Sequence, residues 1–216
     1  MDTKSDEVSM DSKIVPDIIV SRLPRYLQAL EHMQRDGYKT TSSQELGDSI
    51  GISAAQIRKD LSQFGEFGKQ GTGYSITYLV DQIQDILHLN RTWDLAVVGI
   101  GDLGTALTRY QGFFNSGFRI LLAFDNDPKK IGKRIGDIEV MDTSRMAEEI
   151  QKAGVQMAMI TVPAIYAQSI ADELIKGGVK AILNYAPISL NVPKDVHIES
   201  VDPIVKLQHM TFYLEK

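Results

Sequence analysis

The sequence of 216 residues contains no cysteine. Without cysteine the chain cannot form a disulfide scaffold, a thiolate nucleophile or a cysteine-ligated metal site, and we expect it to bind no metal. Long apolar runs are also missing, since none approaches the roughly 18 residues that indicate a transmembrane helix. The first residues are polar and acidic, which is not the pattern of a signal peptide. These absences favour a cytoplasmic protein that has no membrane partner.

The sequence also lacks an excess of positive charge, because its formal net charge is −5 at pH 7. Over the whole chain this balance argues against a nucleic-acid-binding protein. The charge is uneven, however, because residues 12–80 carry a small positive excess while the first eleven residues and the C-terminal two-thirds are acidic. The N-terminal part therefore stays a candidate for nucleic-acid binding. The hydrophobic content of 43% is enough for a packed core.

A glycine-rich stretch at residues 97–104 is the most informative part of the sequence. Gly99, Gly101 and Gly104 fit the pattern G-x-G-x-x-G between an apolar run at 94–98 and a helical pattern that follows at once. In this strand–turn–helix context the glycines permit a tight turn, a close approach of a pyrophosphate and close helix–strand packing. The helix N-terminus then offers free N–H groups to the phosphates. The residues predicted to bind the dinucleotide here are Gly99, Ile100, Gly101, Asp102, Leu103 and Gly104.

A second predicted strand, at 119–124, ends at Asp125, about 20 residues after the last glycine. An acidic side chain at this point can accept hydrogen bonds from the ribose hydroxyls, and it repels a 2′-phosphate. We therefore predict NAD(H) rather than NADP(H), although Arg119, Lys129 and Lys130 lie nearby in the sequence. The alternative is a glycine-rich turn followed by an unrelated surface aspartate.

Strands and helices alternate in the rest of the chain, which is typical of a mostly parallel, doubly wound sheet. Ligands bind at the carboxyl ends of the strands in such sheets. We therefore expect Thr161, Pro163 and Asn184 beside Asp125 at the mouth of the site, unless they are simply turn formers. The expected strands are at 137–140, 155–161 and 180–183, and the expected helices at 144–152 and 164–176.

The N-terminal region has the pattern of a helix-turn-helix. We expect one helix over residues 21–36 and two short helices, starting at Ser42 and Ser53, that a glycine turn joins. Both starts have the form of a capping box, in which a serine is followed three residues later by glutamate or glutamine. A glycine-rich segment at 65–74 then predicts a β-hairpin or wing. The alternative is a small helical domain that binds protein.

The predicted second helix of this pair carries residue types that read base edges in the major groove of DNA. We expect Lys69 in the wing, and Arg22 or Arg25 in the first helix, to contact phosphates. The predicted DNA-binding residues are Gln56, Arg58, Lys59, Ser62, Lys69, Arg22 and Arg25.

The C-terminal residues 202–216 are apolar on nearly every side of a predicted helix, and such a helix must be buried. It packs either on its own sheet or against a second subunit. The domain boundaries that we expect are a disordered tail over 1–12, a winged-helix domain over 13–77, a linker helix over 78–91, a dinucleotide-binding domain over 92–201 and a C-terminal dimerisation helix over 202–216.

This combination resembles the Rex family of redox-sensing transcriptional repressors, from about residue 13 to the end. The resemblance implies a winged helix ahead of a Rossmann domain, and a homodimer that exchanges its C-terminal helices. It also implies a repressor that NADH releases from a palindromic operator. The matching motifs are Arg22-Leu23-Pro24, Gln56 to Gly65, Lys69 with Gly71, Gly73 and Tyr74, Gly99 to Leu107, Ala123 to Gly132, Ile160 to Pro163 and Ile182 to Pro187.

Two positions depart from the family pattern, namely Pro203 at the start of the C-terminal helix and Gln28 in the first helix, where some relatives carry arginine. Both bear on how the cofactor is coupled to DNA. The coupling residues that we expect are Tyr110, near the predicted pocket, and Asp202, at the base of the C-terminal helix. Tyr110 could instead be a core residue at the end of its helix.

The cofactor is predicted to be an effector rather than a reactant. A dehydrogenase needs an acid or base beside the nicotinamide, and only His197 of the four histidines lies in the dinucleotide-binding region outside a predicted helix. No residues remain for a substrate domain once the sheet is built. We therefore predict that the protein is not an enzyme. The alternatives are a small NAD-dependent oxidoreductase and a CoA-binding domain of the ligase type.

Overall fold

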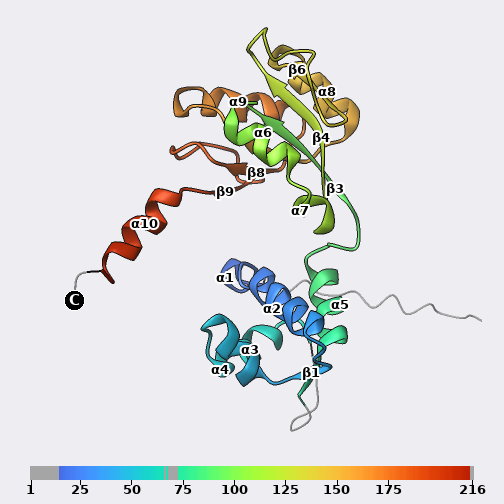
Figure 1. Cartoon of the computed structure of the whole chain (residues 1–216), viewed down its shortest axis with the longest axis vertical. Coiled ribbons are helices and arrows are strands. Elements are labelled where there is room, and N and C mark those ends of the chain that lie inside the picture. Colours follow the sequence, from blue (N-terminus) through green and yellow to red (C-terminus); the bar gives the residue numbers. More distant parts are fainter. Residues whose placement is uncertain (1–14, 66, 68–72, 215–216) are drawn as a thin grey trace, which may run out of the picture. The chain divides into compact units, whose positions relative to one another are not determined.

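The computed structural model describes residues 15–65, 67 and 73–214. The chain divides after Asn90 into two compact units, a helical first unit and an α/β second unit (Figure 1). The predicted tail over residues 1–12 lies outside the described residues. Within the described ranges, no helix is long and apolar enough to cross a membrane.

The first unit packs its helices around one apolar core, in which Leu23, Leu46, Ile57 and Ile83 are fully buried. The helix α5 belongs to this core, because its residues Leu79, Val80 and Ile83 are buried there. The helices of this unit are α1 (Asp17–Val20), α2 (Leu23–Arg35), α3 (Ser43–Ile50), α4 (Ala54–Leu61) and α5 (Ile76–Ile86), and its strands are β1 (Thr40–Thr41) and β2 (Tyr74–Ser75).

Helices α3 and α4 form the predicted helix-turn-helix. Ser42 and Glu45 make a complete capping box, since the Ser42 hydroxyl accepts from the Glu45 N–H at 3.1 Å and Glu45 Oε2 accepts from the Ser42 N–H at 2.6 Å. Ser53 caps α4 by accepting from the Gln56 N–H at 3.2 Å. The second capping box is only half formed, however, because the Gln56 side chain donates to Asp60 instead.

The turn between α3 and α4 depends on two glycines. Gly51 ends α3 with a φ of +70°, a conformation that glycine adopts without strain. A Cβ on Gly47 would overlap the carbonyl oxygen of Ile52, so the chain can fold back this closely only because Gly47 has no side chain. The requirement for Gly51 is visible in the sequence, whereas the requirement for Gly47 is visible only in the fold.

The small sheet of the first unit differs from the expected hairpin. Strand β2 pairs antiparallel with β1, so that Tyr74 lies opposite Thr41 and Ser75 opposite Thr40. The sequence pattern did not predict β1. Residue 66 and residues 68–72 of the predicted wing, Lys69 among them, lie outside the described residues.

The second unit contains the predicted parallel sheet, with the strand order β5-β6-β4-β3-β7-β8-β9. Every neighbouring pair is parallel except β5 and β6. The edge strands β5 and β9 and the short helices α1 and α7 were not predicted. The strands are β3 (Trp93–Val98), β4 (Phe118–Asp125), β5 (Arg134–Ile135), β6 (Ile138–Asp142), β7 (Met157–Ile160), β8 (Ala181–Asn184) and β9 (His197–Ser200).

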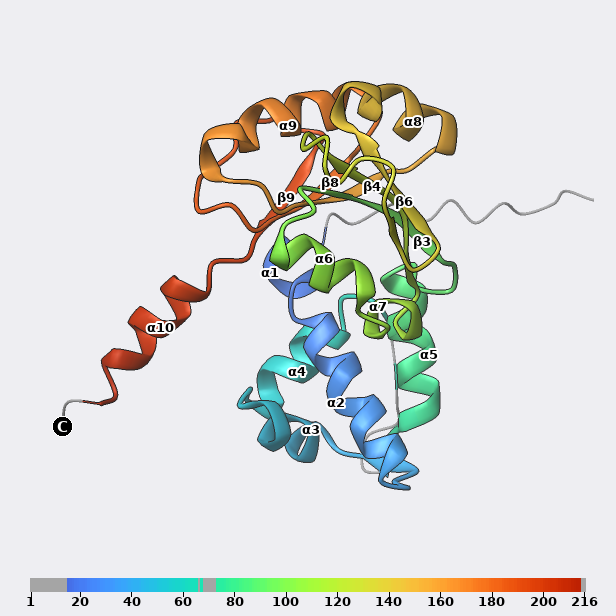
Figure 2. The same cartoon turned by 45° about the horizontal axis from the view of Figure 1, so that its top comes forward.

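Both faces of this sheet are buried, as in other parallel sheets. Along β3, Ala96 and Val98 belong to one apolar cluster while Leu95 and Val97 belong to another. Helices α8 and α9 cover one face and α6 and α7 the other (Figure 2). The helical segments of this unit are α6 (Asp102–Arg109), α7 (Gly112–Asn115), η1 (Thr143–Arg145), α8 (Met146–Ala153), α9 (Ala164–Lys176) and α10 (Pro203–Thr211).

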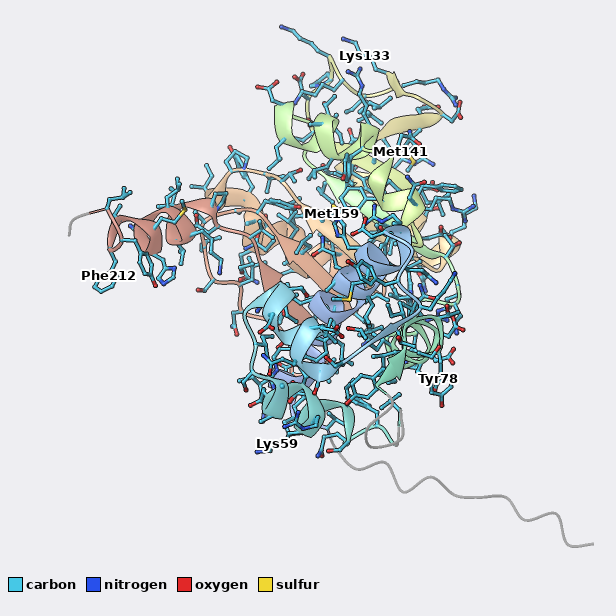
Figure 3. The ribbon with its side chains drawn as sticks, turned by 60° about the horizontal axis from the view of Figure 1, so that its bottom comes forward. Lys59, Tyr78, Lys133, Met141, Met159 and Phe212 are labelled. Carbon is cyan, nitrogen blue, oxygen red and sulfur yellow. The ribbon has the colours of Figure 1, made fainter. Side chains whose placement is uncertain are left out.

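The C-terminal helix α10 has no buried residue within its described length. Leu207 and Met210 are 59% and 57% exposed, and Phe212, which follows the helix, is 78% exposed (Figure 3). Of the two alternatives, packing of this helix on its own sheet is therefore wrong for the single chain. Its apolar side chains are left for another partner to cover.

Candidate cofactor and DNA-binding sites

The glycine turn after β3 has the geometry that the sequence predicted. Gly99 has a φ of +96°, and a Cβ there would lie 2.7 Å from Val162 Cγ1. A Cβ on Gly104 would overlap the carbonyl oxygen of Gly99, so these two glycines are needed for packing. A Cβ on Gly101 would meet nothing within 4 Å. The space above Gly101 therefore fits the close approach of a phosphate group.

Helix α6 begins directly at this turn, and no side chain caps its N-terminus among the described residues. Its first N–H groups are thus available to an anion, which the helix dipole also favours. Asp102 and Leu103 are exposed in the first turn of the helix, whereas Ile100 is buried. The backbone groups of the predicted turn residues can therefore face a ligand. The buried Ile100 side chain instead anchors the turn on the apolar core.

Asp125 ends β4 and is only 5% exposed. Its Oδ2 accepts from the Ile100 N–H at 2.6 Å and from Lys130 Nζ at 3.0 Å, and its Oδ1 accepts from the Asp127 N–H at 2.8 Å. Burial by itself would raise the pKa of Asp125, but these hydrogen bonds and the Lys130 charge outweigh it and lower that pKa. The carboxylate therefore stays ionised at neutral pH.

A carboxylate offers about four acceptor positions, and the described donors to Asp125 use three of them. The remaining position is on Oδ1. Lys130 is the basic neighbour that reaches the carboxylate, whereas Arg119 is paired across the sheet with Asp94 at 2.6 Å. The described contacts of Asp125 therefore leave one acceptor position open on this carboxylate.

The three polar residues expected at the strand ends have different environments. The Thr161 hydroxyl donates to the carbonyl oxygens of Val98 and Gly99, at 2.9 and 2.7 Å, and so ties β7 to the glycine turn. Pro163 is exposed at the start of α9. Asn184 is 1% exposed, and its amide group bonds to the backbone of its own loop. Asn184 therefore shapes the loop instead of facing the mouth.

Tyr110 and Asp202 were predicted as coupling residues. Tyr110 is 63% exposed, with its ring edge-on to Phe113, so the alternative that it is a core residue is wrong. Asp202 caps α10, because its carboxylate accepts from the Ile204 N–H at 2.9 Å. Gln28 is exposed on α2.

The predicted DNA-binding face lies on α4 of the first unit. Arg58, Lys59 and Ser62 are exposed there, and Lys59 extends away from the helix bundle (Figure 3). Arg58 Nη1 donates to the hydroxyl of Ser43 at 2.8 Å, which links α4 to α3. Arg25 is also exposed, and its guanidinium donates to the carbonyl oxygen of Ile50.

Two of the predicted DNA-binding residues are turned inward. Arg22 donates to Asp60 from Nε at 2.6 Å and from Nη2 at 2.8 Å, and the Gln56 amide donates to Asp60 at 2.6 Å. The Tyr26 hydroxyl completes the cluster with a hydrogen bond of 2.6 Å. Sequence reasoning missed Tyr26 and Asp60. An acidic residue on the inner side of a basic, amphipathic helix is the signal that could have found this cluster.

Comparison with known proteins agrees with both units. A family model described as "CoA binding domain" matches residues 90–188, and one described as "Putative DNA-binding protein N-terminus" matches residues 14–62. The chain is 49% identical over 201 residues to the redox-sensing transcriptional repressor Rex of Chloroflexus aggregans, covering 93% of this chain and 95% of the relative. The chain belongs to the Rex family.

Solved structures agree with this assignment. RSP, a Rex-family repressor, has been crystallised with NAD⁺ and operator DNA. That structure is 38% identical to this chain with a TM-score of 0.88, and it covers 93% of both chains. RSP with NADH gives 36% identity and a TM-score of 0.86, and covers 93% of this chain and 94% of RSP. The predicted resemblance to Rex is confirmed, and these Rex relatives are repressors.

Proposed function

We propose that this Rex-family chain is a DNA-binding transcriptional repressor that senses the NADH/NAD⁺ ratio, and that NADH releases it from a palindromic operator. The observation that carries the proposal is the open space above Gly101 next to the ionised Asp125. The complexes of RSP with NAD⁺ and operator DNA and with NADH support it.

In this proposal the backbone from Gly99 to Gly104 and the N-terminus of α6 bind the pyrophosphate. Asp125 accepts a ribose hydroxyl through Oδ1 and excludes a 2′-phosphate. Thr161 keeps the turn in place, and the exposed Pro163 lines the mouth. Asn184 contributes through the shape of its loop. The bound dinucleotide supplies the redox-sensitive ring, and the protein supplies only the binding surface.

The mouth of the proposed site favours NADH over NAD⁺. The segments expected to line it, 161–163 and 186–187, contain no acidic residue. Burying the positively charged ring of NAD⁺ without a partner costs free energy, whereas the reduced ring is neutral. Calorimetry is therefore expected to give tighter binding of NADH, and equal affinities for the two forms would contradict the sensor.

For DNA, Arg58 and Lys59 are the proposed major-groove contacts, supported by their exposure on α4. Ser62 lies on the same helix face, and Arg25 and Lys69 are proposed to contact phosphates. The first unit carries one such helix, so a palindromic operator needs two copies of the chain. Two-fold symmetry then spaces the half-sites by about 34–36 Å or a multiple of it.

The proposed homodimer uses α10. An exposed helix with apolar side chains on most of its surface requires a partner, and Ile204, Val205 and Leu207 are each more than half exposed. We propose that two chains exchange their α10 helices. Size-exclusion chromatography with light scattering is expected to give a dimer, and Leu207→Glu is expected to give a monomer.

The operator titration tests the function as a whole. A palindromic operator is titrated with the protein at fixed salt without cofactor, with NAD⁺ and with NADH. Release by NADH but not by NAD⁺ supports the repressor. Identical curves in all three cases would show that the cofactor has no regulatory effect. Because linkage is reciprocal, operator DNA must lower the affinity for NADH by the same factor.

A second candidate function is CoA binding. It is supported by the family model described as "CoA binding domain", which matches residues 90–188. Competition between NADH and CoA separates the two, since a CoA-binding domain would release NADH when CoA is added. We also propose that the cofactor is not consumed. Incubation of the protein with NADH and small carbonyl compounds is expected to leave the nicotinamide absorbance unchanged.

A further inference from the structure

Four hydrogen bonds converge on Asp60, a residue of α4 that is completely buried. Oδ2 accepts from Arg22 Nε and from the Tyr26 hydroxyl, each at 2.6 Å. Oδ1 accepts from Arg22 Nη2 at 2.8 Å and from Gln56 Nε2 at 2.6 Å. All four acceptor positions of the carboxylate are thus in use. Arg22 and Tyr26 come from the start of α2, so the cluster joins α2 to α4.

The cluster fixes one rotation of α4 against α2. The Arg22 guanidinium binds Asp60 through two parallel hydrogen bonds, which constrain direction as well as distance. Asp60 faces inward, while Arg58 and Lys59, two residues and one residue before it, face outward. If α4 turns about its axis, these two side chains move with it. The direction in which they leave the helix therefore depends on the cluster.

We propose that Arg22 and Tyr26, by holding Asp60, position the recognition helix α4 for its operator without contacting DNA themselves. Gln56 supports the same carboxylate from within α4. This inference rests on the proposed DNA-reading role of α4. It goes beyond that role because it makes operator specificity depend on residues that do not contact DNA. Arg22, which the sequence suggested as a phosphate contact, becomes a positioning residue.

Tyr26→Phe is the sharpest test, because Tyr26 is completely buried and so has no exposed atom to offer DNA. The variant removes one hydroxyl and retains the ring in the core. One hydrogen bond to the carboxylate is lost, so we expect operator affinity to fall by about two- to tenfold. Affinity for non-specific DNA of the same length stays unchanged. Circular dichroism at the assay temperature verifies that the variant is folded.

Tyr78→Phe is the matched control. Tyr78 lies on α5, is 47% exposed and is well separated from Lys59 in the structure (Figure 3). Removing its hydroxyl is expected to leave binding to both DNAs unchanged. If folded Tyr26→Phe binds the operator as tightly as Tyr78→Phe does, the positioning role is refuted. An equal loss on operator and non-specific DNA would refute it too.

The salt dependence of operator binding tests whether Arg22 contacts phosphates. A cation that contacts a phosphate contributes about 0.9 to the slope of log K against log salt concentration. We expect Arg25→Gln, at a proposed phosphate contact, to lower that slope, and Arg22→Gln to reduce operator affinity at an unchanged slope. An equal decrease in slope for Arg22→Gln would assign Arg22 to the DNA contact. Should Arg22→Gln fail to fold, the Tyr26→Phe comparison decides alone.

These outcomes distinguish the inference from the function on which it rests. If Arg58→Ala and Lys59→Gln both leave operator binding intact, α4 does not read DNA and both proposals fail. If these two variants weaken binding while Tyr26→Phe does not, only the positioning role fails.

Discussion

Among the described residues, each of the two units contains one buried aspartate, and the two carboxylates are held in different ways. Asp60 in the first unit is 0% exposed, and its described donors are all side chains, of which Arg22 carries a full charge. Asp125 in the second unit is 5% exposed and accepts from two backbone N–H groups and Lys130. Hydrogen bonds lower the pKa of both carboxylates, although burial would raise it.

The difference separates a structural carboxylate from one that can bind a ligand. Asp60 has every acceptor position occupied, so it can only hold α2 and α4 together. Asp125 retains one position on Oδ1, and one of its partners, the Ile100 N–H, belongs to the glycine turn beside which the dinucleotide is proposed to bind. The same residue type thus serves packing in one unit and recognition in the other, and its donors decide which.

The largest expected effect comes from removing the charge that pairs with Asp60. Arg22→Met leaves a buried carboxylate without its cation, which is expected to cost about 3–5 kcal/mol of unfolding free energy. Urea denaturation followed by far-ultraviolet circular dichroism measures it. The matched variant Lys130→Met removes the cation beside Asp125. Because the Lys130 side chain is 36% exposed and two backbone donors remain, its cost is expected below about 1 kcal/mol. If Arg22→Met and Lys130→Met lowered the unfolding free energy equally, the two carboxylates would not differ in their dependence on a paired cation.

Asp125→Ala is expected to weaken NADH and NAD⁺ alike, by roughly 1.5–3 kcal/mol, the usual worth of a hydrogen bond to a charged group. The variant also frees the N–H groups of Ile100 and Asp127 and the Lys130 ammonium, so its discrimination against NADPH is expected to fall. Calorimetry with the three nucleotides measures both effects. Unchanged affinity for NADH would show that Asp125 is as structural as Asp60.

Arg58→Ala is expected to cost about 1–3 kcal/mol of operator binding if the side chain reads a guanine. Lys69→Ala is instead expected to weaken binding to all sequences and to reduce the salt slope. Gel retardation on operator and scrambled DNA compares the two variants. The same loss on both DNAs for Arg58→Ala would reduce Arg58 to a phosphate contact.

The smallest expected effect is a pH dependence. A carboxylate whose folded pKa is lowered stabilises the fold fully above its unfolded pKa of about 3.9 and loses this contribution as pH falls through the folded value. Asp60 and Asp125 both have lowered pKa values, so the stability of the wild type is expected to fall with acid in this window. Asp125→Asn is expected to flatten the part of the curve that comes from the second unit. If the stability of Asp125→Asn falls with acid in parallel with that of the wild type, Asp125 makes no contribution to the pH dependence.

Much of the site could be predicted from local sequence, because local signals control local structure. Gly99, Gly101 and Gly104 act through their own backbones, and the spacing to Asp125 follows from one helix and one strand. The capping box of Ser42 and Glu45 is complete within four residues. Edge strands such as β5 and β9 could not be predicted, because they are short and owe their pairing to neighbours distant in the sequence.

The sequence by itself determined the order of the two units, the parallel sheet, the glycine turn and the family. Only the tertiary structure decided how the polar side chains are used. Arg22 and Gln56 look like DNA contacts in the sequence, but a carboxylate 38 residues from Arg22 binds both of them. Asn184 looks like a ligand contact, but its own loop uses its amide. Hydrogen-bond partners depend on positions in space, and spacing along the chain carries no record of them.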